Sequence, residues 1–222
     1  MSQEIKIEKK ASEVIQPKSV EEALEAIRTR KDLSGADLHG MALGNTHAVG
    51  AILRKTNLAG ADLSHGLLIN PNFYKASLLG TAAHNTIILG GDLVKTSFKD
   101  TDLSSSAIIG ADAREASFEG ANLRNAGLVS SDLTDAVFTR ADLTNARLAG
   151  LDVTGADFTG ADLTGTRAYN VNWEKAKITP STIPDPIIEL PTWAWSVLLG
   201  GFLGFFALII YSLTRRKRKP SA

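Results

Sequence analysis

Aspartate is the reactive residue that recurs most regularly in this sequence. Asp or Asn stands at every tenth residue from Asp92 to Asn172. Paired carboxylates can act as general acid and general base. Each of these aspartates, however, occupies the same place in a repeated unit, and short acidic side chains at such places accept hydrogen bonds from the backbone of a turn. The pattern therefore indicates turn chemistry and predicts no catalytic pair.

The other residue types that carry chemistry are scarce. The four histidines, His39, His47, His65 and His84, lack the spacing of metal ligands. The chain contains no cysteine, which excludes a thiolate nucleophile, a disulfide framework and a cysteine-ligated metal. The sequence has no serine nucleophile elbow, phosphate-binding loop or dinucleotide fingerprint. We therefore predict that the protein is not an enzyme and has no catalytic, cofactor or metal site.

A period of five residues positions these side chains. An apolar residue recurs at every fifth position from Leu33 to Ile178, and 21 of these 30 central positions are Leu or Phe. Two residues earlier most units carry a small side chain, but Pro71 stands there in the third coil and lacks a backbone donor. Helices repeat at three and four residues and strands at two, so a sustained five predicts a solenoid, with a local irregularity at Pro71.

The repeated unit is clearest in residues 141–165, which read ADLTN ARLAG LDVTG ADFTG ADLTG. These A(D/N)LxX units resemble the pentapeptide-repeat proteins, and the resemblance covers residues 31–180. It implies an all-β solenoid, a right-handed quadrilateral β-helix of about seven coils, in which the central and small residues point inward. With 20 residues in each coil, we expect four central phenylalanines to stack inside it: Phe98, Phe118, Phe138 and Phe158.

One of the four faces of such a coil is predicted to be aliphatic. It consists of the units 46–50, 66–70, 86–90, 106–110, 126–130, 146–150 and 166–170, and it contains no Asp, whereas the other three faces are polar. We call it the aliphatic face. An exposed apolar patch of roughly a few hundred Å² usually marks an interaction. We predict a partner interface formed by outward residues of this face: Val49, Leu67, Ile69, Ile87, Leu89, Ile109 and Val129.

Several occupants of the aliphatic face are open at this point. The first is an unidentified protein partner, and the second is another copy of this chain in a homodimer. A third is the N-terminal arm of the chain, folded back over the face. Finally, the β-branched residues could be present only for their strand propensity.

A group of basic residues lies near one corner of the predicted solenoid, and we call it the basic corner: Arg54, Lys55, Lys75, Lys95 and Arg114. It could hold phosphate or lipid headgroups. The preferred interpretation is a solvated edge that is balanced by Asp92, Asp112 and Glu115. Basic residues alone are a weak signature of nucleic-acid binding, so no nucleic-acid partner is expected.

The N-terminal 30 residues are predicted to precede the solenoid as an arm and a helix. Residues 1–18 are charged and weakly periodic, which favours a flexible arm. In the segment 19–30, Ser19 and Glu22 match a capping box in which each side chain accepts from the other residue's amide. The apolar stripe that follows, Val20, Ala23, Leu24 and Ile27, predicts a short helix that caps the first coil.

The C-terminal residues predict a membrane anchor. Residues 181–192 are proline-rich and favour an extended linker. Residues 193–213 form an uncharged apolar stretch long enough to cross a bilayer as a helix that contacts membrane lipid, and a basic tail follows at 214–222. Aromatic residues mark both ends of the helix, and two glycines form a GxxxG pair that favours helix association: Trp193, Trp195, Gly200, Gly204 and Tyr211.

The position of the basic residues after the helix favours a single-pass protein with a cytoplasmic C-terminal tail and leaves the side of the repeat domain open. The resemblance implies a competing function, because some pentapeptide-repeat proteins resemble DNA in shape and charge and bind gyrase. Residues 31–180 carry 13 Lys and Arg against 16 Asp and Glu, a weak negative charge for such mimicry. We therefore predict a membrane-anchored scaffold that presents an interaction surface, with a DNA-mimicking regulator of DNA gyrase or topoisomerase as the alternative.

Overall fold

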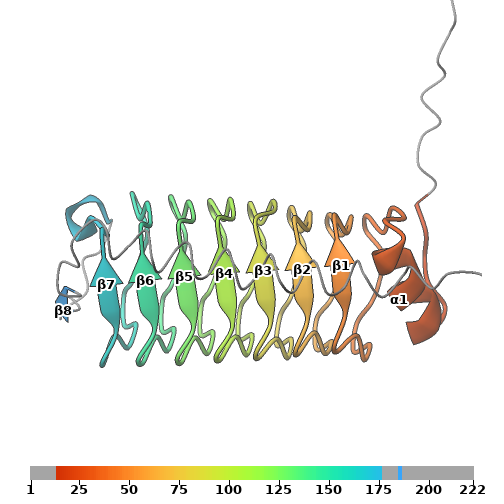
Figure 1. Ribbon diagram of the computed structural model, residues 1–222, viewed down its shortest axis with the longest axis horizontal. Coiled ribbons are helices and arrows are strands. Elements are labelled where there is room, and N and C mark those ends of the chain that lie inside the picture. Colours follow the sequence, from red (N-terminus) through yellow and green to blue (C-terminus); the bar gives the residue numbers. More distant parts are fainter. Residues whose placement is uncertain (1–13, 177–184, 187–222) are drawn as a thin grey trace, which may run out of the picture. The chain divides into compact units, whose positions relative to one another are not determined.

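The computed structural model describes residues 14–176 and the pair 185–186 (Figure 1). The chain divides into two compact units, Met1–Asp185 and Pro186–Ala222. The first 13 residues of the predicted arm lie outside the described residues. So do nearly all of the predicted linker at 181–192, the predicted membrane helix at 193–213 and the basic tail at 214–222. Within the described ranges, no helix has the length and apolarity needed to cross a membrane.

The first unit is a parallel β-solenoid. Three-residue strands follow one another at 20-residue intervals along one face, each paired in parallel with the next, so that six full turns separate the first from the seventh (Figure 1). A two-residue strand, β8 (Asp185–Pro186), follows β7 in the strand order. The seven strands are β1 (His47–Val49), β2 (Leu67–Ile69), β3 (Ile87–Leu89), β4 (Ala107–Ile109), β5 (Gly127–Val129), β6 (Arg147–Ala149) and β7 (Arg167–Tyr169).

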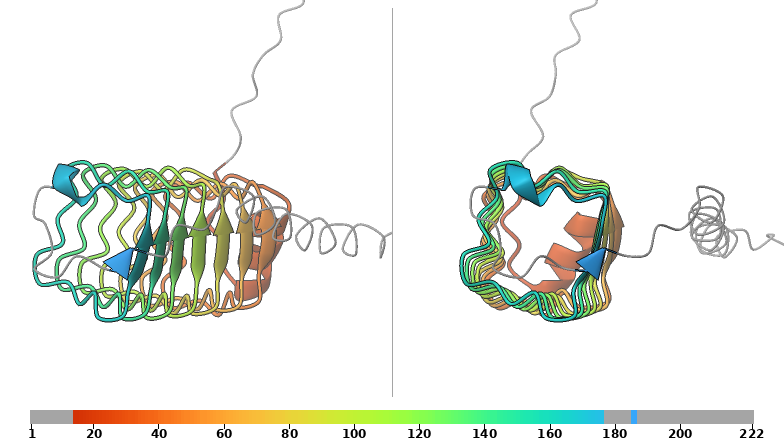
Figure 2. Two further views of the ribbon diagram at one scale, coloured as in Figure 1. Left: turned by 60° about the vertical axis from the view of Figure 1, so that its left-hand side comes forward. Right: turned by 90° about the vertical axis from the view of Figure 1, so that its left-hand side faces the viewer.

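Each coil has four sides, as the view along the solenoid shows (Figure 2). On the three sides without strands, single parallel bridges join residues 20 apart, for example Asp92 to Asp112 on one side and Asp102 to Asn122 on another. The predicted all-β quadrilateral solenoid with 20-residue coils is therefore confirmed. Because each coil forms hydrogen bonds only with its neighbouring coils, the free energy of unfolding of the solenoid is close to a sum of contributions from single coils and their contacts.

The interior is filled by the central residues, all of which are buried between Leu33 and Trp173. The predicted phenylalanine column is confirmed. The rings of Phe98 and Phe118 lie 4.9 Å apart and nearly parallel, and the spacing is 4.8 Å from Phe118 to Phe138 and from Phe138 to Phe158. Trp173, in the short helix η1 (Trp173–Lys175), meets Phe158 edge to face at 5.1 Å and closes the column.

Buried threonines at the small position add hydrogen bonds that sequence reasoning missed. The Thr56 hydroxyl donates to the Leu33 carbonyl of the previous coil at 2.9 Å, and Thr86 donates to the Leu63 carbonyl at 2.8 Å. A buried hydroxyl needs a partner because an unsatisfied one costs free energy. The signal in the sequence was Thr in place of Ala at a position that most units bury.

The ladder continues past Pro71, so the irregularity predicted at that residue is wrong. The Asn72 amide donates to the Ala51 carbonyl at 2.8 Å, and the Asp92 amide donates to the Pro71 carbonyl at 2.9 Å. The adaptation lies one coil later, at Gly91, whose φ is 98°. A Cβ on Gly91 would lie 2.5 Å from the Pro71 carbonyl oxygen, so only glycine fits beside the proline.

A nine-residue helix, α1 (Val20–Arg28), covers the first coil. Ser19 Oγ accepts from the Glu22 amide at 3.2 Å, as the capping box predicts, but the Glu22 carboxylate accepts from the Lys18 amide and not from Ser19. The helix buries Ala23, Ala26 and Ile27 against the core. Ala26 therefore belongs to the apolar stripe, although the prediction did not include it.

The end of the predicted arm is also part of the fold. Val14 makes a parallel bridge with Asp32, and the Ile15 amide donates to the Asp32 carbonyl at 2.8 Å. The chain therefore joins the first coil several residues before the capping box.

Candidate interaction surface

The structure brings the predicted interface residues together on the aliphatic face, which is the face formed by β1 to β7. Strand register places their side chains in two outward columns that run along the solenoid. The first column contains His47, Leu67, Ile87, Ala107, Gly127, Arg147 and Arg167. The second contains Val49, Ile69, Leu89, Ile109, Val129, Ala149 and Tyr169.

Most of these aliphatic side chains are half-buried, because each lies between the same position of the coil above and the coil below. Val49, at the N-terminal end of its column, is 45% exposed. The columns therefore form a continuous, rigid apolar strip and not a set of separate exposed side chains. Within the two columns, Arg and Lys occur only at the C-terminal end, as the exposed Arg147 and Arg167, and at the N-terminal end Arg30 Nε donates to the Val49 carbonyl.

The aspartates of the polar faces are engaged in turns, as predicted. Asp152 Oδ1 accepts from the Thr154 amide at 3.0 Å and from its hydroxyl at 2.7 Å. Hydrogen bonds from the Thr154 side chain and amide hold the pKa of Asp152 below its ordinary value, and the Ser64 hydroxyl does the same to the pKa of Asp62. Carboxylates that are stabilised as anions are poor proton donors near neutral pH, so these residues suit a structural role.

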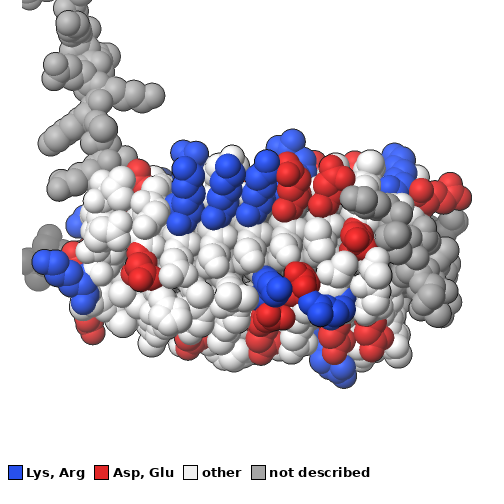
Figure 3. Space-filling model, turned by 180° about the vertical axis from the view of Figure 1, so that it is seen from behind, with Lys and Arg blue, Asp and Glu red and all other residues white. Residues whose placement is uncertain are grey.

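The basic corner is a row of side chains along one edge. Lys55, Lys75 and Lys95 occupy the same corner position in successive coils, each with a positive φ of 56° to 59°, and Glu115 and Asp135 continue the row. Figure 3 shows this change from basic to acidic side chains along the edge.

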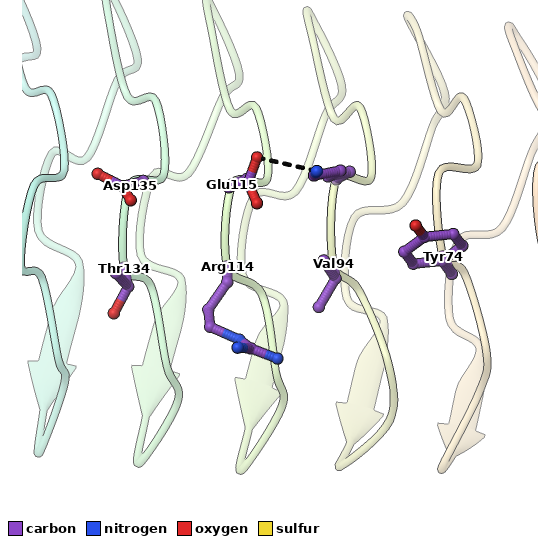
Figure 4. Close-up of a pocket in the computed structure, with 7 residues that line it drawn as sticks. Tyr74, Val94, Arg114, Glu115, Thr134 and Asp135 are labelled. Atoms are coloured by element: carbon purple, nitrogen blue, oxygen red, sulfur yellow. Dashed lines mark ion pairs between the residues drawn. The ribbon is translucent and has the colours of Figure 1, made fainter.

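An aromatic residue lies inside the basic corner, which sequence reasoning overlooked. The Tyr74 ring centre lies 5.4 Å from the Arg54 guanidinium and 5.1 Å from the Lys75 ammonium. Next to Tyr74 is an open cavity of about 260 Å³ that Val94, Lys95, Arg114, Glu115, Thr134 and Asp135 also line (Figure 4).

The charges around that cavity are largely balanced within the chain. Lys95 pairs with Glu115 at 3.2 Å, and the Arg114 guanidinium pairs with Asp112 at 2.7 Å. The corner therefore contains both solvated cations and neutralised pairs, and the arrangement is not a concentrated anion site.

A family comparison decides what kind of repeat this is. The sequence profile described as pentapeptide repeats (8 copies) matches residues 32–68, 101–140 and 136–172. The chain carries pentapeptide repeats. No curated protein matches the chain.

One solved structure shares the fold of the pentapeptide-repeat domain. A trypsin-treated variant of QnrB1, a plasmid-mediated fluoroquinolone resistance protein, is 21% identical, with a TM-score of 0.50 over 77% of this chain and 95% of that chain. HetL, a pentapeptide-repeat protein involved in heterocyst differentiation regulation in the cyanobacterium Nostoc sp. strain PCC 7120, is 21% identical. Its TM-score is 0.37 over 68% of this chain and 86% of that chain.

Two histidines of the pentapeptide-repeat domain lie closer together than the sequence suggested. The rings of His65 and His84, in successive coils, are 5.2 Å apart, and His84 Nδ1 is 3.8 Å from Asp102 Oδ2. His39 and His47 lie on two other faces. Among the residues that the structure describes, no group of three or more His, Asp and Glu side chains is placed to hold a metal ion.

Proposed function

We propose that this chain is a membrane-anchored, non-catalytic scaffold whose pentapeptide-repeat domain presents the aliphatic face to another protein or to a second copy of itself. The observation that carries this proposal is the two-column aliphatic strip on β1 to β5. At the equivalent outward sites, the other three faces of the same solenoid carry mainly Ser, Thr, Asp, Lys and Arg.

The core does not explain the strip. Residues beneath it, such as Leu68 and Ile108, are buried in the same way as Leu63 and Leu103 beneath a polar face. Any outward residue that suits a strand would serve the fold, so a second column that is aliphatic at every coil from Val49 to Val129 calls for a reason outside the fold. Burial against a partner is the reason that fits an apolar strip of this kind.

The membrane anchor is part of the proposal because of the sequence of residues 193–213. An uncharged stretch of this length, with tryptophans at one end and a basic tail after the other, has the composition of a bilayer-spanning helix. Extraction of the full-length chain from membranes with alkaline carbonate tests it. We expect the chain to stay in the pellet, and a variant that lacks residues 193–213 to be released. Release of the full-length chain would contradict the anchor.

The interaction is tested by replacing three residues at the centre of the strip, Ile87, Leu89 and Ile109, with Ser in the full-length chain. We expect the variant to fold, because the three side chains point outward, and to lose association as measured by light scattering and pull-down. Leu79→Ser is the matched control, since Leu79 is an aliphatic residue on a polar face and is 45% exposed. Unchanged association of the triple variant would contradict the proposal that the aliphatic face is an interface.

Regulation of DNA gyrase or topoisomerase by DNA mimicry is the second candidate. The observation in its favour is the fold shared with the trypsin-treated QnrB1 variant, which extends over 95% of that chain. Against it, the 13 basic residues of the repeat domain nearly balance its 16 acidic ones, and three lysines form a row where a DNA mimic needs negative charge. A gyrase supercoiling assay with the purified chain separates the two functions: inhibition or protection of gyrase would favour this candidate.

A further inference from the structure

The columns of the aliphatic face also indicate which partner fits them. We propose that the face pairs with the same face of a second copy, with the two solenoids side by side and pointing in the same direction. This inference rests on the proposed function, because it names the partner of the surface described there.

The two columns are complementary to each other when two copies meet about a twofold axis parallel to the solenoid. In that arrangement, the first column of each copy lies opposite the second column of the other, coil by coil. Leu67 then faces the partner's Ile69, and Ile87 faces the partner's Leu89. In the next two coils the small Ala107 and Gly127 face the partner's Ile109 and the partner's Val129, which are larger. A small residue opposite a large one lets facing layers interdigitate.

The charged residues favour the parallel direction. In the parallel pair, Arg147 faces the partner's Ala149 and Arg167 faces the partner's Tyr169, whose ring can receive a guanidinium. An antiparallel pair that overlays all seven strands instead places Arg147 against the partner's Leu67, which removes a charge from water without a counterion. An antiparallel pair centred on β3 avoids this contact but overlays only five strands. The parallel pair thus overlays all seven strands and keeps both arginines at the C-terminal end of the face, away from the aliphatic residues of β1 to β5.

The area of the strip sets the strength of the contact. Seven coils at a spacing of about 4.8 Å, with a width of about 10 Å for three residues, give roughly 340 Å² on each copy and roughly 700 Å² in total. Stable interfaces bury about 1,200 to 2,000 Å². The pair is therefore weak in dilute solution, and it is favoured where two copies are confined together, as two chains in one membrane would be. A parallel pair also leaves both C-terminal ends of the repeat domain at the same end of the assembly.

Because the chain contains no cysteine, introduced cysteines are its only thiols, which makes crosslinking decisive. Two differently tagged full-length copies, one with Ile87→Cys and the other with Leu89→Cys, are expressed together and treated with a short bis-maleimide. The parallel pair places these cysteines opposite each other, so we expect a crosslinked heterodimer. Copies with Leu67→Cys and Ala107→Cys are the matched control, since these residues face each other only in the antiparallel pair centred on β3.

A crosslink in the first combination and not in the control supports the parallel pair, and the reverse result overturns it. Adding Ile69→Lys to both copies should lower the crosslinked fraction about tenfold or more, because each lysine would be buried against the partner's Leu67. Leu79→Lys should leave it unchanged. If the Leu89→Cys copy is linked to another polypeptide and not to a second copy, this inference fails while the proposed function stands. If the Leu89→Cys copy is linked to nothing, this inference fails, and the light-scattering and pull-down test of the Ile87, Leu89 and Ile109 variant decides the proposed function separately.

Discussion

The aliphatic face and the three polar faces cover one core with two kinds of backbone. On the polar faces, an acidic or polar residue often precedes the central residue and accepts a hydrogen bond from the turn that follows, as Asp157 does from the Thr159 amide. A backbone hydrogen bond then closes the corner, as from the Ala141 amide to the Phe138 carbonyl at 3.0 Å. On the aliphatic face the same positions form a three-residue strand, as in Ala107–Ile109. The small residue after that strand, Ala111, donates its amide to the Ser131 hydroxyl of the next coil at 3.2 Å.

This difference separates the part of the unit that specifies the fold from the part that is free to serve a function. The central residues are buried on all four sides, and parallel backbone hydrogen bonds join successive coils on each side. The outward residues differ between sides and contribute little to the core. An interaction surface can therefore change without loss of the solenoid, and the outward columns are where function is to be sought.

The largest expected effect tests whether both kinds of face share one core. Phe118→Ala, beneath a polar face, should lower the free energy of unfolding by about 3 to 5 kcal/mol, because it removes the middle of the aromatic column. Leu128→Ala, beneath the aliphatic face, should cost about 2 to 5 kcal/mol. Urea unfolding followed by circular dichroism measures both. A nearly neutral Leu128→Ala would show that the aliphatic face is not part of the same cooperative core.

The corner after the aliphatic face provides the second test of how that face differs from the polar faces. Gly91→Ala should destabilise strongly, because the added Cβ would lie 2.5 Å from the Pro71 carbonyl oxygen in a backbone with positive φ. Gly110→Ala is the matched control. Its φ is 68°, nothing lies within 4 Å of the added Cβ, and the expected cost is about 1 to 2 kcal/mol for the left-handed conformation alone. Equal costs, measured as shifts in Tm, would refute the role of Pro71.

Much of this structure was predictable from the sequence because each five-residue unit repeats the same pattern of central and small residues. The five-residue period, the 20-residue coil, the phenylalanine column and the two outward columns all follow from spacing alone. The fit of Gly91 to Pro71 was not predictable, because it depends on atoms in contact between residues 20 positions apart. The same is true of Arg54 over the Tyr74 ring and of the neighbouring His65 and His84, since each contact joins residues of successive coils.

A smaller effect is expected from removing one turn cap. Asp152→Ala should cost about 1 kcal/mol, because the Thr154 amide and hydroxyl lose their acceptor. Asp152→Asn keeps an acceptor and should recover most of that loss. On the aliphatic face, Ala107→Ser changes an outward residue that caps no turn, and its effect should stay within about 0.5 kcal/mol. If Ala107→Ser cost as much as Asp152→Ala in urea unfolding, the outward residues of the aliphatic face would be structural.

The smallest effect separates the faces by pH. The pKa values of Asp62 and Asp152 are held below the ordinary value by hydrogen bonds from Ser64 and Thr154, so these carboxylates stabilise the folded state above about pH 4. That contribution is lost as the pH falls through the lowered pKa values, and it is modest because both groups are largely solvated.

The double variant with Asp62→Asn and Asp152→Asn should therefore show a smaller fall in Tm than the natural chain between about pH 5 and about pH 2. Ile87→Ser should leave the slope of Tm against pH unchanged, because the aliphatic face has no carboxylate to titrate. An altered slope in Ile87→Ser would mean that the aliphatic face is coupled to the aspartate turns on the other faces. The two kinds of face could then no longer be treated as independent surfaces on one core.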